Sequence, residues 1–216
     1  PTFLQQLALL KDFDLDVLDE NSPEFVHLVV EATKLAFADR EAFYGDTNFN
    51  RVPMDILLSE EYNIERRRLI SEKSSMEVRP GNIPGFGGEV TVRPKGTTPE
   101  SFSKFDIGEP TVARFDEPSP NSLGDTKGDT THFDIIDKWG NMIAGTPSGG
   151  WLQSSPIIPK LGFCLSNRGQ MFWLDDNSPA CIGPKRRPRT TLSPSLALKD
   201  GVPYMVFGTP GGDQQD

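Results

Sequence analysis

Apolar and charged residues recur at helical spacing through the first part of the chain. Residues 3–18 repeat leucines three or four positions apart, which predicts a helix. A second helix is predicted to start at Asn21–Glu24, a run that offers a capping side chain, an early proline and a carboxylate in the first turn. It is predicted to reach about Tyr44, with Gly45 ending it. Its apolar face comprises Phe25, Leu28, Val29, Ala32, Leu35, Ala36 and Phe43.

A third helix is predicted from Ser59 to about Ser71. It carries Glu65-Arg66-Arg67-Arg68, which we interpret as a solvent-exposed face with ion pairs three or four positions apart. Residues 73–129 lack clear periodicity, and from about Val92 onwards they are rich in Pro, Gly, Ser, Thr and Asp. A loop of that length is uncommon inside a compact domain, so we expect it to be functional or disordered.

Short β-prone segments replace the helical pattern after residue 129. The predicted strands are Thr131–Asp137, Met142–Thr146, Gly162–Ser166, Ser193–Lys199 and Pro203–Phe207. The first two are expected to form a hairpin around Gly140-Asn141. The last two are expected to form another, because Asp200-Gly201 between apolar runs favours a two-residue turn. The chain is thus predicted to be helical first and β-rich second.

Composition and charge narrow the class of protein. The chain has 216 residues, 36% hydrophobic and 25% charged, which allows one packed domain or a domain with a helical appendage. A net charge of −9 argues against a large nucleic-acid footprint. No apolar stretch approaches the roughly 18 residues of a membrane span. The basic cluster Lys185–Arg189 is interpreted as a solvated loop, with an anion- or carboxylate-binding role as the alternative.

The few cysteines and histidines give no metal-site pattern, so no metal is expected. Cys164 and Cys181 do not make a disulfide framework, and Cys164 is predicted to lie in the core because its neighbours are apolar. Asp46–Asn50 is similar to the start of a calcium loop. However, Arg51 replaces the required glycine and Leu57 the bidentate glutamate, so calcium binding is not expected.

Thr130 is the candidate nucleophile. It follows the irregular stretch and opens a predicted strand, which suits a chain that cuts itself between Asp129 and Thr130. The new terminal α-amine, with a pKa of roughly 7.7–8, could accept the proton of the same residue's hydroxyl. The alternative is that Thr130-Thr131 merely begins a strand, because threonine favours strands. His132 is expected to be packed or hydrogen-bonded rather than catalytic.

A second candidate is Gly208-Thr209-Pro210-Gly211-Gly212, which directly follows a predicted strand. Its glycines allow backbone N–H groups to approach a ligand closely, and two such groups could stabilise an oxyanion. A plain turn or a helix start is the alternative. The run Arg189–Pro194 offers several hydroxyls and, taken alone, is interpreted as a polar loop entering a strand.

Together these pieces resemble the γ-glutamyltranspeptidase family (glutathione hydrolases), whose members are N-terminal nucleophile hydrolases. The similar motifs occur in the family's order: Glu31–Arg40 with Gly45-Asp46, Asp129–Phe133 with Asp137-Lys138 and Gly140-Asn141, Arg187-Pro188 with Ser193-Pro194, Lys199-Asp200-Gly201, and Gly208–Gly212. The resemblance implies an α+β fold with four αββα layers, of which this chain is a part. It also implies that residues 1–129 are the C-terminal part of a large subunit and residues 130–216 the N-terminal part of a small catalytic subunit.

The resemblance implies a mechanism that requires no cofactor. The Thr130 hydroxyl would attack the carbonyl of Asp129, and hydrolysis of the resulting ester would separate the subunits, which remain partners of each other. The freed Thr130 would then attack a γ-glutamyl amide such as glutathione. Water or an amino acid would resolve the acyl-enzyme.

The resemblance also assigns further site residues by position. Ser148 matches the hydroxyl residue that holds the nucleophile's amine. Thr190 and Thr191 match two serines that contact the substrate carboxylate, and Gly211 and Gly212 match the oxyanion hole.

The pocket of this sequence departs from the family pattern. Met171 falls where an acidic residue usually grips the glutamyl ammonium, Arg168 replaces a neutral or acidic neighbour, and Gly150 stands where asparagine is common. One alternative is therefore an acylase for another amide, similar to the cephalosporin acylases. A non-catalytic domain that never matures is a further alternative. The sequence leaves the compartment open.

Overall fold

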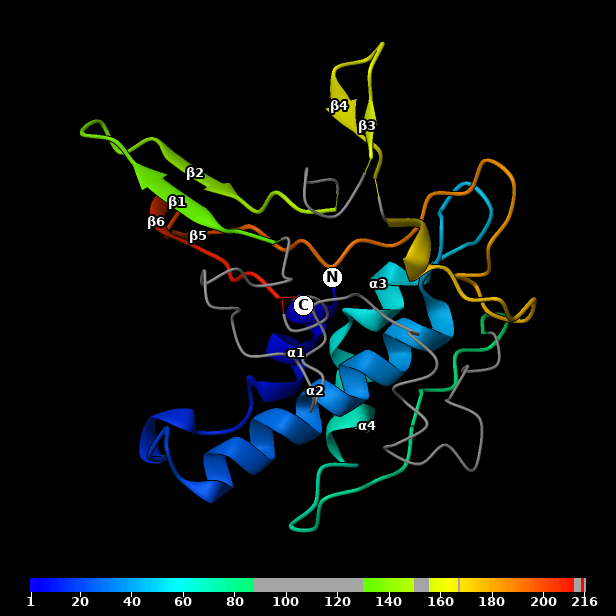
Figure 1. Cartoon of the computed structure of the whole chain (residues 1–216). Helices are drawn as coiled ribbons and strands as arrows, with labels where there is room; N and C mark the ends of the chain where they lie inside the picture. Colours follow the sequence, from blue (N-terminus) through cyan, green and yellow to red (C-terminus); the bar gives the residue numbers. More distant parts are fainter. Residues whose placement is uncertain (88–129, 150–155, 167, 212–214, 216) are drawn as a thin grey trace, which may run out of the picture. The chain divides into compact units, whose positions relative to one another are not determined.

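A computed structural model describes residues 1–87, 130–149, 156–166, 168–211 and 215, and shows an α+β protein (Figure 1). The described residues fall into two compact units. Residues 1–87 and 172–189 form a helical unit, and the remaining described residues form a β-rich unit. The order of helices before strands agrees with the sequence pattern, although residues 172–189 join the helices.

Helix α2 (Pro23–Phe43) is the longest element of the helical unit. The Ser22 hydroxyl accepts a hydrogen bond from the Phe25 N–H at 3.1 Å, and Pro23 occupies the first turn, so the predicted start is confirmed. Tyr44 ends the helix in extended conformation. Gly45 is needed for a different reason, because a Cβ there would overlap the carbonyl oxygen of Pro179.

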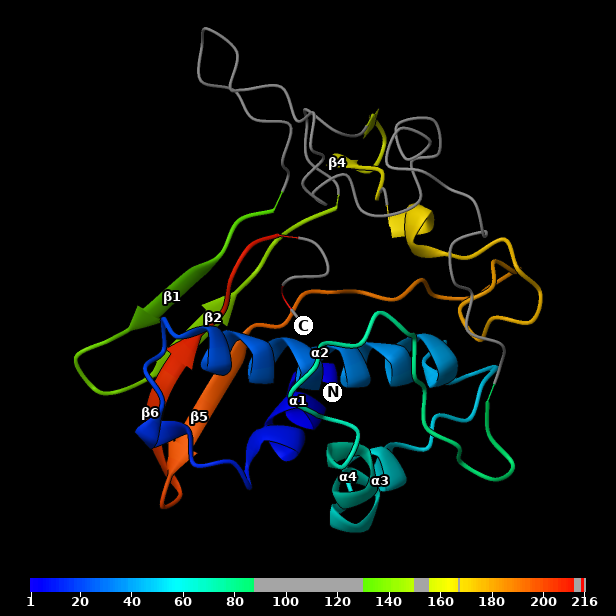
Figure 2. The same ribbon diagram turned by 90° about the horizontal axis from the view of Figure 1, so that it is seen from below.

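Helix α1 (Thr2–Leu10) contacts both α2 and α4, as Figures 1 and 2 show. The helix predicted over residues 3–18 is wrong beyond Leu10, where a turn and a short 3₁₀ segment, Leu15–Val17, follow. Aspartates at positions 12, 14 and 16 explain the early end, because this side chain competes for backbone hydrogen bonds.

Helix α4 (Glu60–Arg67) starts where predicted but is shorter. The Ser59 hydroxyl caps it by accepting the Tyr62 N–H at 3.3 Å. The preceding helix α3 (Met54–Leu57) was not predicted, because four residues are too few to show a helical period.

Two apolar clusters hold the helical unit together. One buries Leu9, Ala32, Leu35 and Ala36 between α1 and α2. The other buries Ala42, Phe43, Leu57 and Ile83. The second cluster fixes α3 and the irregular segment before residue 87 against the end of α2.

The prediction of a solvated Glu65–Arg68 face is wrong for Arg66 and Arg67. Arg66 is only 4% exposed and donates from Nη2 and Nε to the two carboxylate oxygens of Asp39, at 3.1 and 3.3 Å. Arg67 donates to backbone carbonyls of α1 and pairs with Asp12. Only the Arg68–Glu65 pair is the exposed i,i+3 pair that the pattern predicted.

Asp39 is fully buried and collects donors from several segments. Besides Arg66 it accepts from the Gln5 amide at 2.6 Å, the Tyr62 hydroxyl at 3.0 Å and the Gly81 N–H at 2.7 Å. Burial, followed by the charge of Asp39, raises the pKa of Tyr62. This network ties the irregular segment around Gly81 to α1, α2 and α4.

Residues 172–189 are attached to the helical unit by polar contacts. Arg187 donates its backbone N–H and its guanidinium to Asp46, both at 2.7 Å. Arg189 pairs with Glu41, which also accepts the Trp173 indole N–H at 3.0 Å. Two residues of the basic cluster, Arg187 and Arg189, are therefore engaged in ion pairs within the chain, and the anion- or carboxylate-binding alternative stays a prediction.

The β-rich unit contains three antiparallel hairpins among its described residues. Their strands are β1 (Phe133–Ile136) with β2 (Met142–Gly145), β3 (Ile157–Ile158) with β4 (Phe163–Cys164), and β5 (Ser195–Lys199) with β6 (Val202–Phe207). β3 was not predicted. Asp200 and Gly201 both have positive φ (54° and 77°), which confirms the predicted two-residue turn.

The β1–β2 and β5–β6 hairpins lie side by side, with β6 in contact with β1 and β2 (Figures 1 and 2). Both hairpins expose large apolar side chains, among them Ile135, Ile143 and Leu198. Cys164 is half-buried, so its predicted place in the core is wrong, whereas Cys181 is buried. The four-layer arrangement stays a prediction.

Candidate functional site

The hydroxyl oxygens of Thr130 and Ser148 lie 2.6 Å apart, within hydrogen-bonding distance. The β1–β2 ladder explains this placement. It pairs Phe133 with Gly145, and the Thr131 N–H continues the pairing by donating to the Pro147 carbonyl at 3.2 Å. In the same register Thr130 lies opposite Ser148, so the strand pairing itself brings the two hydroxyls together.

His132 follows Thr130 by two residues, so in extended backbone the two side chains point to the same face. Its Nδ1 is 2.7 Å from the Thr146 hydroxyl and its Nε2 is 2.9 Å from an Asp134 carboxylate oxygen, so it is hydrogen-bonded as predicted. Thr146 and Asp134 were not singled out from the sequence. A sequence signal existed for Asp134, because residues 130, 132 and 134 are two positions apart and therefore share one face of an extended segment.

The glycine motif after β6 is described only in part. Gly211 is half-buried with a φ of 122°, a conformation that favours glycine. Gly208 packs against His132, because a Cβ at Gly208 would overlap the imidazole ring. Asp129 and Gly212 lie outside the described residues, so their predicted roles stay predictions.

The two candidate threonines before β5 differ in exposure. Thr190 is exposed, and its hydroxyl accepts the Leu192 N–H at 3.2 Å. Thr191 is fully buried, with its hydroxyl 3.5 Å from the Gln215 amide nitrogen. Of the two threonines, Thr190 alone is exposed.

The segment 168–171 forms a short 3₁₀ turn. Met171 is buried, with 4% of its surface exposed. Arg168 is half-buried, and burial lowers the pKa of its guanidinium. Position 171, where the family usually has a carboxylate, is therefore occupied by a buried thioether side chain. Gly150 lies outside the described residues.

No cluster of three or more metal-ligating side chains occurs in the part of the chain that the structure describes. Asp46, the first residue of the calcium-like run, is engaged by Arg187. The Arg187 hydrogen bonds hold the pKa of the Asp46 carboxyl well below its usual range. None of the described helices is long and apolar enough to cross a membrane.

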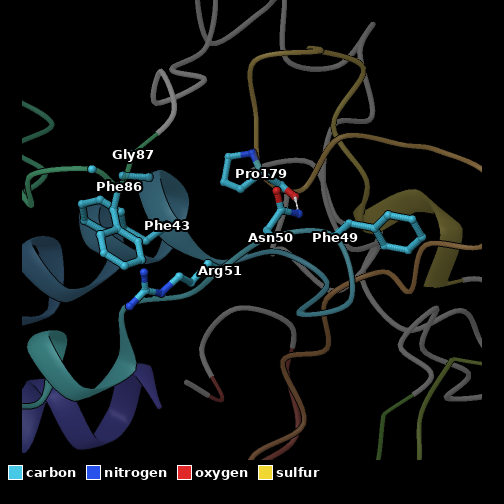
Figure 3. Close-up of a pocket in the computed structure, with 9 residues that line it drawn as sticks. Phe43, Phe49, Asn50, Arg51, Phe86, Gly87 and Pro179 are labelled. Atoms are coloured by element: carbon cyan, nitrogen blue, oxygen red, sulfur yellow. Dashed lines mark hydrogen bonds between the residues drawn. The ribbon is translucent and has the colours of Figure 1, made fainter.

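A cavity of about 240 Å³ lies in the helical unit, away in sequence from Thr130 (Figure 3). Phe43 and Phe86 line it together with Arg51, whose guanidinium lies 4.8 Å from the Phe86 ring centre. Asn50 points to Pro179 and donates to its carbonyl at 2.8 Å. The predicted site residues do not line this cavity.

Comparison with known proteins gives the family. The sequence profile of gamma-glutamyltranspeptidase matches residues 1–216. The chain belongs to the gamma-glutamyltranspeptidase family. The glutathione hydrolase proenzyme of Bacillus subtilis subsp. natto is 30% identical over 97% of this chain and 32% of its own length. The acylase ACY 1 proenzyme of Pseudomonas sp. (strain SE83) is 29% identical over 96% of this chain and 30% of its own length.

Solved structures also align over the chain. The structure named LmbA2991HD is 49% identical, covers 100% of this chain and 33% of its own, and has a TM-score of 0.72. A cephalosporin acylase from Bacillus halodurans has the same fold in this region, with a TM-score of 0.67 at 24% identity over 99% of this chain and 31% of its own. The chain spans about a third of the length of the gamma-glutamyltranspeptidase relatives it matches.

Proposed function

We propose that the chain is part of a self-processing N-terminal nucleophile amidohydrolase in which Thr130 is the nucleophile. The observation that carries this proposal is the 2.6 Å contact between the Thr130 and Ser148 hydroxyls. The proposed cut between Asp129 and Thr130 releases the α-amine of Thr130 and leaves Ser148 within the chain. In the proposed four-layer αββα fold, residues 1–129 belong to the large subunit and residues 130–216 to the small one.

The proposed chemistry has two stages. First, Thr130 Oγ1 attacks the carbonyl carbon of Asp129 and the C–N bond breaks, so the backbone nitrogen becomes a free amine and an ester remains. Water hydrolyses the ester and leaves the Asp129 carboxylate. In the second stage the amine accepts the Thr130 hydroxyl proton, Oγ1 attacks the substrate amide carbonyl, and the C–N bond breaks as that proton passes to the leaving amine. Water or an amino acid then attacks the Thr130 ester, takes the acyl group and returns a proton to Oγ1.

Ser148 and the glycine motif have separate roles in this scheme. Ser148 holds the Thr130 hydroxyl before the cut and the neighbouring amine after it. The backbone N–H groups of Gly211 and Gly212 would stabilise the oxyanion of each tetrahedral intermediate. Arg168, Thr190 and Thr191 are proposed to contact the acyl group. No cofactor takes part in either stage.

Mass spectrometry of the complete parent protein tests the scission. We expect two chains, the second beginning Thr-Thr-His, and a single uncut chain for Thr130→Ala. Thr130→Ser is the matched control, because it keeps a hydroxyl and an α-amine and is expected to cut more slowly. A cut chain in Thr130→Ala, or an uncut wild-type protein after prolonged incubation, would refute the proposal.

The leading acyl donor is a γ-glutamyl amide such as glutathione, by analogy with the glutathione hydrolase relatives. A second candidate is a non-glutamyl amide. The buried Met171 favours it, because a charged ammonium beside a thioether loses a charge-assisted hydrogen bond worth about 1.5–3 kcal/mol. Acylase relatives are consistent with this alternative. Comparing kcat/KM for a γ-glutamyl anilide and for a β-lactam side-chain amide decides between them.

A further inference from the structure

One face of the β1–β2 hairpin carries a row of polar groups that extends beyond the candidate nucleophile. Asp134 lies in β1, and Thr130 and His132 lie in the extended segment before it, so the three alternate and their side chains share a face. Thr146 and Ser148 lie opposite them, in the segment that follows β2. Asp134 contacts His132, and His132 contacts Thr146. Two residues after Thr146 in the sequence, Ser148 contacts Thr130.

The direction of each proton in this row follows from the groups present. A carboxylate only accepts, so His132 Nε2 donates to Asp134. In the neutral imidazole Nδ1 then carries the lone pair and accepts the Thr146 hydroxyl proton. His132 has 7% of its side chain exposed and Thr146 is 7% exposed, so water has little access to replace either partner.

The same imidazole also contacts the glycine motif. A Cβ at Gly208 would overlap His132 Cε1, so the backbone of Gly208, where the loop Gly208–Gly211 begins, lies directly on the ring. The φ of Gly208 is outside the left-handed region, so close approach, not backbone conformation, requires glycine there. His132 thus contacts two elements, the strand that carries Ser148 and the loop that carries Gly211.

We propose that His132 and Thr146 are positioning residues that set the distance between Thr130, Ser148 and the Gly208–Gly211 loop. This inference rests on the proposed function of Thr130. His132 holds Thr146 two residues before Ser148, and the ring sets how closely the loop approaches the hairpin. Reacting groups must be held within about 0.5 Å of their working geometry, and a 1 Å displacement can cost about 10²-fold in rate.

Substitutions at Thr146 test the hydroxyl in the complete parent protein. Thr146→Val keeps the shape of the side chain and removes the hydrogen bond to His132. We expect it to slow self-cleavage and to lower kcat at least tenfold with KM changed less than threefold. Thr146→Ser restores the hydroxyl and is expected to recover most of the rate, which a purely space-filling role would not require.

A matched control removes a comparable hydroxyl from the helical unit. The Thr33 hydroxyl donates to the Gln6 side chain at 3.0 Å, so Thr33→Val also deletes one side-chain hydrogen bond. We expect Thr33→Val to shift Tm without slowing cleavage. Cleavage and kcat within twofold of wild type in Thr146→Val would overturn the proposal, as would equal slowing in Thr33→Val at the same loss of Tm.

A second pair of variants decides the matter if Thr146→Val does not fold. Gly208→Ala pushes the loop away from the His132 ring and is expected to slow cleavage at least tenfold. In a His132→Ala background the overlap disappears, so adding Gly208→Ala should cost less than twofold more. Full additivity of the two substitutions would contradict a shared contact.

Thr130→Ala, measured in parallel, separates the two proposals. An uncut Thr130→Ala protein together with a Thr146→Val protein that behaves as wild type overturns only the positioning roles. A Thr130→Ala protein that is still cut overturns the proposed function itself.

Discussion

Asp46 and Arg187, which lie on opposite sides of the proposed scission in the sequence, are joined by hydrogen bonds of 2.7 Å from the Arg187 backbone and from its guanidinium. Asp46 has 1% of its side chain exposed, although Arg187 is largely exposed. Because both residues belong to the helical unit, that unit contains sequence from each of the two proposed subunits.

Stability at low pH should depend on Asp46. Arg187 lowers the folded-state pKa of this carboxyl below its unfolded value, so the carboxylate adds stability that is fully present above about pH 4. That stability is lost as the pH falls further towards the lowered folded-state pKa. We expect the Tm of the parent protein to fall below about pH 4, and to fall less steeply in Asp46→Asn.

A control for this prediction is Asp16→Asn, which removes an exposed carboxylate from the 3₁₀ segment after α1. It should leave the pH dependence of Tm unchanged. If Tm falls equally steeply below about pH 4 in wild type and in Asp46→Asn, other carboxyl groups govern the loss of stability in acid.

The two pieces of a cut chain should remain associated. Asn50 binds the Pro179 carbonyl, and Glu41 accepts the Trp173 indole N–H, so polar contacts bridge the cut in addition to Asp46–Arg187. We expect both pieces to co-elute in size-exclusion chromatography without denaturant. Gly45→Ala should weaken this association, because its Cβ would overlap the Pro179 carbonyl oxygen.

Two arginines at the end of α4, Arg66 in the helix and Arg68 directly after it, should differ sharply in their contribution to stability. Arg66→Ala leaves the buried Asp39 carboxylate without its charged partner and is expected to cost about 3–5 kcal/mol. Arg68→Ala breaks only the exposed pair with Glu65 and should cost about 0.5 kcal/mol or less. Chemical denaturation of the two variants measures the difference, and equal losses would contradict the buried role of Arg66.

Removing the Ser148 hydroxyl should slow the chemistry without abolishing it. Ser148→Ala deletes the 2.6 Å contact with Thr130, and a net hydrogen bond of about 1.4 kcal/mol corresponds to about tenfold in rate. We expect about a tenfold slower cut, followed over time on denaturing gels. Ser148→Thr keeps the hydroxyl and should stay close to wild type, whereas a Ser148→Ala protein that is cut at the wild-type rate would argue against the pair.

Features that depend on neighbouring residues, such as helix caps and turns, were predicted well from the sequence. Contacts between residues far apart in the sequence were not. Ser22 caps α2 and Asp200-Gly201 turns a hairpin because each depends on neighbouring residues alone. Arg66 was mistaken for a surface residue, since nothing near it in the sequence reveals that Asp39 is buried 27 residues away. The role of such a residue depends on tertiary packing, which a helical period does not encode.

The candidate site shows the same limit. Thr130 was singled out because it follows a stretch of different composition and opens a predicted strand, and Ser148 was assigned from the resemblance to the family; both roles stay predictions. The contact of His132 with Thr146 follows from the register of the β1–β2 hairpin, whereas its contact with Gly208 depends on how two hairpins pack, and no spacing in the sequence predicts that packing.

The discontinuous helical unit also has a consequence for synthesis on the ribosome. The helices emerge first, but their partners at Trp173, Pro179, Arg187 and Arg189 are translated only after residues 88–171. The last contacts of this unit therefore form after Thr130 has been translated. A nascent chain arrested before residue 172 would lack those contacts, which makes completion of the helical unit a late event in biogenesis.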